Sequence, residues 1–260
     1  MMYRIVKVLN HNTFIGIRSK DKCKCLIMGK GIAFGRKVSE SISVGEDAKV
    51  YTLTELTERG SAEEIIRSVP PECLELAGEI LDHAEKVFGQ IDRSILFPMA
   101  DHLAFAVQRI RNQEQISNPL TEDIRILFHQ EYKVAKCAEQ LLRERLHVEI
   151  DEHEIGYIAL HVHAAIEDQK VSQAMQLTRA VRDCISLVEK QTGTTIDVMS
   201  LSYNRLMNHI RYMVARALSG EKLKVNMNDY ISIRFPKAFD MASQVCGEMM
   251  KNLKICLDDV

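Results

Sequence analysis

The sequence predicts a multi-domain protein in which a small antiparallel β-sheet domain precedes two all-α helical bundles. Three observations predict this order. Short runs of apolar and β-branched residues are concentrated in roughly the first 55 positions. Apolar residues at helical spacing dominate the remainder. A stretch of this helical region also occurs twice, because residues 95–111 align with residues 202–218 at a constant offset of 107.

The predicted sheet domain, called the head here, covers residues 1–56. Its strand-like segments lie at 3–9, 13–18, 26–29, 41–44 and 48–53, and His11-Asn12 separates the first two as a turn would. Residues 1–37 contain nine basic side chains against one acidic side chain, whereas residues 38–68 contain three against seven. This division of charge predicts a polyanion-binding module followed by a region that controls it.

The helical region is predicted from apolar spacing and from helix-end signals. Residues 72–88 follow the start signal Pro70-Pro71 and end before Gly89, which suits a C-cap. Further helices are predicted at 94–111, 131–146 and 151–168, the last with an acidic first turn. The pattern then restarts near residue 170. The predicted domains are the head at 1–56, a linker at 57–69, a first bundle at 70–169 and a second bundle at 170–260.

The duplicated stretch has kept a histidine and an arginine seven positions apart. His102 aligns with His209, and Arg109 aligns with Arg216. Seven residues are almost two helical turns, and long side chains lean towards the helix N-terminus, so each arginine tilts back towards its histidine. Such an arginine could contact a phosphoryl group carried on the ring. The alternative interpretation is two solvated arginines near helix C-termini.

The second copy of the repeat is predicted to be short. KICLDDV at 254–260 aligns with HVEIDEH at 147–153, so the counterpart of EIGYIALH at 154–161 falls beyond the last residue. We therefore expect the second bundle to lack its last helix, and with it the counterpart of His161.

Composition and motif spacing argue against several other classes of protein. With 46% hydrophobic residues and 5 prolines the chain should fold, and it has no apolar run of about 18 residues. We expect a cytoplasmic protein without membrane insertion, with its seven scattered cysteines reduced. MGKGIAFGRK at 28–37 fits neither a dinucleotide fingerprint nor a P-loop, and Tyr157 stands where an HExxH zinc site needs its second histidine. No enzyme activity, metal or cofactor is therefore predicted.

Four segments resemble one known family. KVLNHN at 7–12, MGKGIAFGRK at 28–37, the FPMADHLAF block around His102 and DEHEIGYIALH ending at His161 resemble the BglG/SacY/LicT family of transcriptional antiterminators. The resemblance covers essentially the whole chain. It implies an RNA-binding co-antiterminator head and two phosphotransferase-regulation domains. The implied function is to stabilise an antiterminator hairpin in the nascent mRNA of a sugar-utilisation operon, under control of histidine phosphorylation.

The resemblance also assigns residues to this function. It implies RNA contacts from Lys7, Asn10, Asn12, Gly29, Lys30, Phe34 and Arg36. Asparagine amides can read base edges, an aromatic ring can stack on an unpaired base, and lysines neutralise phosphate. Lys30 stands where relatives commonly have arginine, and Gly35 where many have glutamine, which alters the contacts available to RNA.

Phosphorylation is implied at His102, His161 and His209, with Arg109 and Arg216 as candidates to contact the phosphoryl group. The implied partners are an RNA hairpin, a second copy of the chain, the phosphocarrier protein HPr and a sugar-specific enzyme II of the phosphotransferase system.

Two other functions compete with this interpretation. A histidine phosphorelay protein would pass phosphate onward, but no nucleotide- or sugar-binding motif supports it. A DNA-binding activator controlled by the same phosphotransferase system would normally carry a helix-turn-helix, whereas this head has a β pattern.

Overall fold

The computed structural model describes residues 1–45, 47–54, 56–57, 60–114, 116–167, 170–197, 200–219 and 225–253. It divides into two compact units. The first unit contains Met1–Ser117 and Gln130–Lys170, and the second contains Asn118–His129 and Val171–Val260. Among the described helices, none combines the length and apolar composition that crossing a membrane requires.

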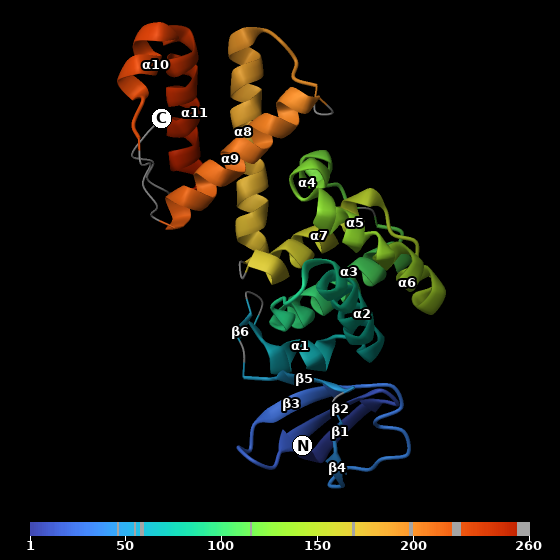
Figure 1. The fold of residues 1–260 in the computed structure, drawn as a ribbon. Coiled ribbons are helices and arrows are strands. Elements are labelled where there is room, and N and C mark those ends of the chain that lie inside the picture. The colour runs from blue at the N-terminus through green and yellow to red at the C-terminus, as the bar shows by residue number, and fades with distance from the viewer. Residues whose placement is uncertain are drawn as a thin grey trace. The chain divides into compact units, whose positions relative to one another are not determined.

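The head is the five-stranded antiparallel sheet that the sequence predicts (Figure 1). Its strands are β1 (Met2–Asn10), β2 (Thr13–Arg18), β3 (Lys24–Met28), β4 (Ser41–Ser43) and β5 (Lys49–Thr52), in the spatial order β4-β1-β2-β3-β5. The predicted turn at His11-Asn12 is a two-residue hairpin loop, because Asn10 pairs with Thr13 across β1 and β2. Strands β2 and β3 are buried at most positions, as expected for a sheet covered on both faces, and one face of β3 buries Cys25 and Ile27 in the head's own core.

The other face of the head lies against helices of the first unit. Tyr51 of β5 and Phe97 make an edge-to-face contact with ring centroids 6.1 Å apart. A Cβ placed on Gly78 would lie 3.5 Å from Cε of Met28, so the helix backbone approaches the sheet closely at this glycine. The head is therefore packed directly on the helix that contains Gly78.

The helices of the first unit agree with most of the sequence pattern. They are α1 (Ala62–Ser68), α2 (Pro71–Phe88), α3 (Leu96–Arg111), α5 (His129–Ala135), α6 (Cys137–Leu146) and α7 (Glu152–Glu167). A two-stranded ribbon of β6 (Leu56–Thr57) and β7 (Gly60–Ser61) leads into α1, and a 3-10 turn at Arg93–Ile95 leads into α3. Gly89 is the C-cap of α2 with φ 83°, as predicted, and Ser61 and Glu64 form a capping box at α1.

Two details of the first unit differ from the sequence prediction. The helix predicted at 131–146 is interrupted at Lys136, although the backbone there stays in the helical region with φ −58° and ψ −22°. The stretch predicted as a linker contains α1, which buries Ile65 and Ile66. Helix α1 is only seven residues long, and a helix of that length is stabilised mainly by tertiary packing. Burial of these two side chains therefore accounts for it.

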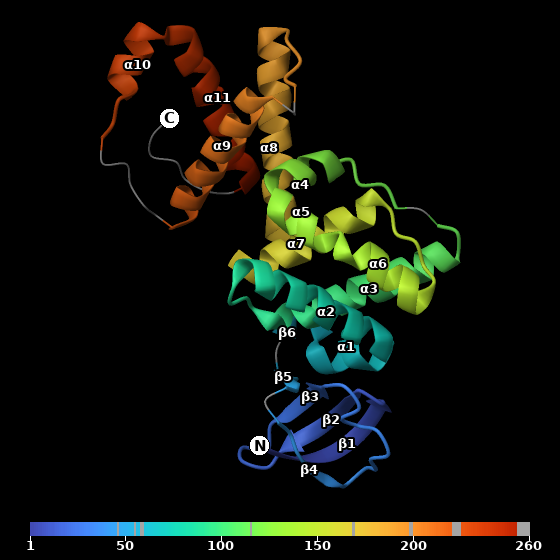
Figure 2. The ribbon, with the colours of Figure 1, turned by 45° about the vertical axis from the view of Figure 1, so that its right-hand side comes forward.

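The second unit contains α4 (Thr121–Leu127), α8 (Val171–Thr192), α9 (Leu201–Ser219), α10 (Asn228–Arg234) and α11 (Pro236–Leu253). Helix α11 packs along α8 (Figure 2). Helix α4 comes from the first copy of the repeat but packs on α8 and α9. There the buried hydroxyl of Tyr203 donates a hydrogen bond to Asp123, 3.3 Å away. The predicted boundary at residue 170 remains a prediction, and residues 254–260, on which the short second copy was argued, lie outside the described residues.

Candidate nucleic-acid interface and histidine site

The predicted RNA contacts gather around one end of the head. Lys7 is exposed on β1, Asn10 ends that strand, and Asn12 is in the turn that follows. Gly29 directly follows β3, and Lys30, Phe34 and Arg36 lie in the exposed loop between β3 and β4. The basic Arg36 lies 4.0 Å from the carboxylate of Glu40 in that same loop.

Hydrogen bonds tie this loop to the β1–β2 turn. The backbone N–H groups of Asn12 and Gly31 donate to the side-chain oxygens of Asn10 and Asn12, at 2.9 and 2.8 Å respectively. The N–H groups of Gly29 and Ala33 donate to the carbonyls of Asn12 and His11, at 2.9 and 3.0 Å. Each predicted asparagine therefore uses its oxygen to shape the turn, and its amide nitrogen takes no part in these turn contacts.

Phe34 is an exposed aromatic side chain of the head, with 68% of its surface accessible. The ring of His11 meets it edge-on, with centroids 5.1 Å apart and planes at 78°. Gly31 and Gly35, which lie in this loop on either side of Phe34, have φ of 66° and 67°, which an L side chain rarely adopts. An exposed ring held in this way is suited to stacking on an unpaired base. The sequence prediction did not include His11, although its place between Asn10 and Asn12 was a signal.

One carboxylate from the helical region reaches this surface. The Nδ2 atoms of Asn10 and Asn12 donate hydrogen bonds to the two oxygens of Glu75 on α2, at 2.7 and 3.2 Å. Arg145 of α6 lies 3.4 Å from the same carboxylate. One N–H donor of each asparagine amide is thus occupied by Glu75.

A second polar cluster lies between α3 and α7 and contains His102. Its Nε2 is 3.0 Å from one carboxylate oxygen of Glu154, and the guanidinium of Arg109 is 2.7 Å from the other. Glu154 is therefore bracketed by the histidine and the arginine that the repeat singled out. The predicted proximity of His102 and Arg109 is mediated by a carboxylate that the sequence prediction missed.

His161 and Tyr157 complete this cluster from α7. The ring of His102 lies 5.4 Å from that of His161 and 5.5 Å from that of Tyr157, centroid to centroid. His102 and His161 are each 7% exposed, and Glu154 is 2% exposed. The two predicted phosphoacceptors of the first bundle therefore share one nearly closed site. Glu154, Tyr157 and His161 are spaced by three and four residues, which is the helical signal that could have found the first two.

Electrostatics keep Glu154 ionised. Burial alone would raise the pKa of its carboxyl, but the contacts with His102 and Arg109 outweigh burial and hold the pKa below its usual range. A negative charge is thus fixed between the ring of His102 and the arginine.

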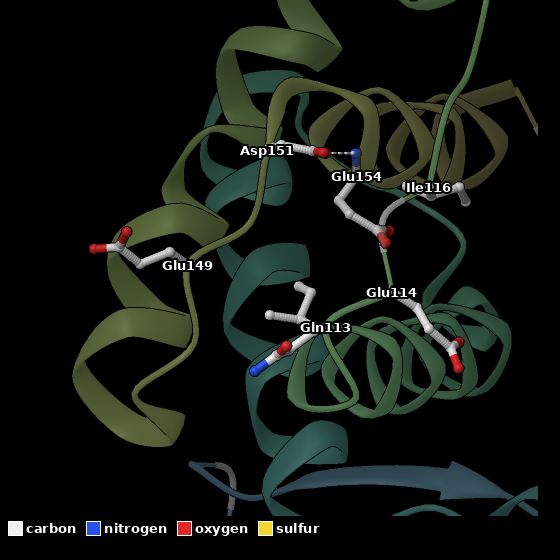
Figure 3. A pocket seen from close by; sticks show the side chains of 7 residues that line it. Gln113, Glu114, Ile116, Glu149, Asp151 and Glu154 are labelled. Atoms are coloured by element: carbon white, nitrogen blue, oxygen red, sulfur yellow. Dashed lines mark hydrogen bonds between the residues drawn. The ribbon is translucent and has the colours of Figure 1, made fainter.

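A pocket opens beside Glu154. It is lined by Ile110, Gln113, Glu114, Ile116, Glu149, Asp151 and Glu154 (Figure 3). Asp151 accepts a hydrogen bond of 3.0 Å from the backbone N–H of Glu154, which fixes the first turn of α7. With four carboxylates among its seven lining residues, the pocket carries negative charge.

The other histidines are placed differently. His163 is 3% exposed and its Nδ1 lies 3.0 Å from Glu131, so it is a buried partner of α5 and not a surface histidine. His209 of α9 is exposed, in contrast to His102, and Arg216 follows it on the same helix. The described residues contain no cluster of three or more histidine, cysteine or acidic side chains that could hold a metal ion.

Models of known protein families match both the head and the helical region. A model of the CAT RNA binding domain matches residues 3–59. A model of the PRD domain matches residues 78–165 and again residues 182–260.

Individual proteins match along most of their length. The GlcA/glcB genes antiterminator of Staphylococcus carnosus is 26% identical, with 97% of this chain and 90% of that protein covered. The transcription antiterminator LicT of Bacillus subtilis is 24% identical, with 93% and 88% covered. A crystal structure of GlcT CAT-PRDI superimposes with a TM-score of 0.54 at 26% identity, covering 64% of this chain and 99% of that one.

Proposed function

We propose, because the chain belongs to the PRD-domain family and carries an N-terminal CAT RNA-binding domain, that it stabilises an antiterminator hairpin in the nascent mRNA of a sugar-utilisation operon. It is an RNA-binding transcriptional antiterminator under phosphotransferase-system control. The observation that carries the proposal is the exposed Phe34 beside the asparagine turn, inside the matched RNA-binding domain.

The proposed RNA surface consists of Lys7, Asn10, Asn12, Gly29, Lys30, Phe34 and Arg36. The ring of Phe34 stacks on a base from a bulge or loop, and the asparagine amides donate to base edges. Gly29 leaves no side chain between this surface and the RNA, and the basic residues neutralise phosphates. The head acts on RNA as a dimer of two chains.

The probe for this surface is obtained by selection. The full chain is incubated with a library of RNA hairpins whose internal loops are randomised, and bound hairpins are enriched over several rounds. We expect one family of bulged hairpins to emerge. When this enriched hairpin overlaps a terminator in a transcription template, adding the protein should increase readthrough of that terminator. Failure to enrich any hairpin would count against the proposed function.

The proposed control acts through the His102 cluster. A phosphoryl group on Nε2 of His102 would lie where the carboxylate of Glu154 now lies, between that nitrogen and Arg109. The N–P bond of a phosphohistidine donor breaks as the N–P bond to His102 forms. The carboxylate of Glu154 then moves away from the site, because it and the phosphoryl group are both anionic and repel each other. Arg109 then pairs with the phosphoryl oxygens. His161 and His209 are the other proposed acceptors, and Arg216 is the proposed phosphoryl contact for His209. HPr and a sugar-specific enzyme II are the proposed donors.

Phosphorylation is expected at these histidines alone. After incubation with a reconstituted general phosphorelay that includes HPr, mass mapping should find acid-labile, alkali-stable phosphate at His102, His161 or His209. His102→Gln should remove its label, whereas His83→Gln, at an exposed site on α2, should leave the pattern unchanged. An unlabelled chain, with the relay active on a control acceptor, would refute control by phosphorylation.

A further inference from the structure

The carboxylate of Glu75 occupies the surface on which the proposed function depends. Its two oxygens accept from the amides of Asn10 and Asn12, residues 65 and 63 positions earlier in the chain. Side-chain amides have only two N–H donors each, so a donor held by Glu75 is not available to a base edge at the same time.

Glu75 belongs to an acidic face of α2 that lies against the basic head. Glu75, Glu79 and Asp82 are spaced by four and three residues and therefore share one side of the helix. Asp82 forms an ion pair with Lys49 of β5, and together with Lys30 these residues line one cleft between the head and α2. Each of these carboxylates is ion-paired, because Arg145 contacts Glu75 and Glu79, and Arg93 contacts Asp82 in addition to Lys49.

The position of Glu75 is fixed by its other neighbours. Arg145 of α6 contacts both Glu75 and Glu79, and only 15% of the Glu75 side chain is exposed. Gly78, on the same side of α2, permits the close approach to Met28. Helix α2 also packs on α3, which carries His102, so the contact lies one helix away from the histidine cluster.

We propose that Glu75 is an internal competitor of RNA, and that a hairpin binds the head only after displacing this carboxylate from Asn10 and Asn12. The inference rests on the proposed RNA-binding function. Its physical basis is an exchange of partners: the amide donors held by Glu75 must leave its carboxylate before they can meet a base edge.

Glu75→Gln tests the inference in the full chain. Glutamine keeps the size of the side chain but has one acceptor oxygen, so its own NH2 group would face one of the two asparagine donors. We expect the enriched hairpin to bind this variant roughly tenfold more tightly than the unmodified chain at low salt, because one charge-assisted hydrogen bond no longer competes. Glu72→Gln is the matched control, since it removes the same charge from an exposed position on α2.

The outcomes separate the inference from the function. An affinity of Glu75→Gln equal to that of Glu72→Gln would overturn the inference and leave RNA binding intact. A weaker affinity would also overturn it, because Glu75 would then arrange the asparagines for RNA.

A measurement without RNA completes the test. The side-chain amide NMR signals of Asn10 and Asn12 should shift in Glu75→Gln and stay in place in Glu72→Gln. Unchanged signals in both variants would overturn the inference alone. If no variant binds any hairpin, the proposed function fails and the inference falls with it.

Discussion

Glu154→Ala should lower the free energy of unfolding of the first unit by about 3 kcal/mol, because it leaves a buried histidine and a partly buried arginine without their shared carboxylate. The side chains of His102 and Glu154 are 9% and 3% exposed, and that of Arg109 is 26% exposed. Water therefore has little access to compensate for the lost contacts. Denaturant unfolding, followed by a probe placed in the first unit, measures the change.

The matched control is Glu149→Ala. Glu149 pairs with Arg143 at 3.5 Å, but its side chain is 81% exposed, so removing it should change the free energy of unfolding by less than about 0.5 kcal/mol. Equal effects of the two substitutions would contradict the role assigned to Glu154.

The effect of Glu154 on stability should also depend on pH. Its pKa in the folded protein is lower than the value of about 4.3 expected in the unfolded chain. The carboxylate therefore contributes fully above that unfolded pKa, and its contribution is lost as the pH falls through the folded pKa. The stability difference between the unmodified chain and Glu154→Gln should shrink below about pH 4, in unfolding curves recorded at several pH values.

Phe34→Ala should weaken binding of the enriched hairpin by about 1–3 kcal/mol if the ring stacks on a base. The ring is 68% exposed, so its removal should leave the circular dichroism spectrum and the unfolding midpoint nearly unchanged. Fluorescence anisotropy titrations give the affinity, and Phe34→Tyr should keep most of it, because the ring is retained.

Val38→Ala serves as the control for Phe34. Val38 lies in the same loop and is 59% exposed, but it has no ring to stack. A loss of affinity no larger for Phe34→Ala than for Val38→Ala would exclude stacking as the source of binding.

The sequence predicted the head well because its strands carry local signals. Apolar and polar residues alternate at the start of β1, β2 is a short apolar run, and the turn between them is marked by polar His11 and Asn12. Helix α2 was likewise bounded by its proline start and by Gly89. In these elements the local pattern and the final packing agree, so the sequence alone was sufficient.

The remaining features depend on contacts between distant positions. The placement of α4 on α8 and α9 is set by tertiary packing, with Tyr203 and Asp123 brought together from positions 80 apart. The contact of Asn10 with Glu75 joins a turn to a helix 65 positions later. Neither contact leaves a periodic trace in the chain. The repeat identified His102 and Arg109, but their link runs through Glu154, which lies on another helix.

The most direct test of the account is a salt titration of hairpin binding by the full chain. The enriched RNA hairpin and a DNA hairpin of matched sequence are titrated from low to physiological salt. We expect the RNA to bind more tightly at every salt concentration, and its affinity to fall steeply as salt rises, because basic residues of the head release counterions from the phosphates. Equal affinity for the RNA and DNA hairpins, or an RNA affinity independent of salt, would contradict the assignment of the head as an RNA-binding surface.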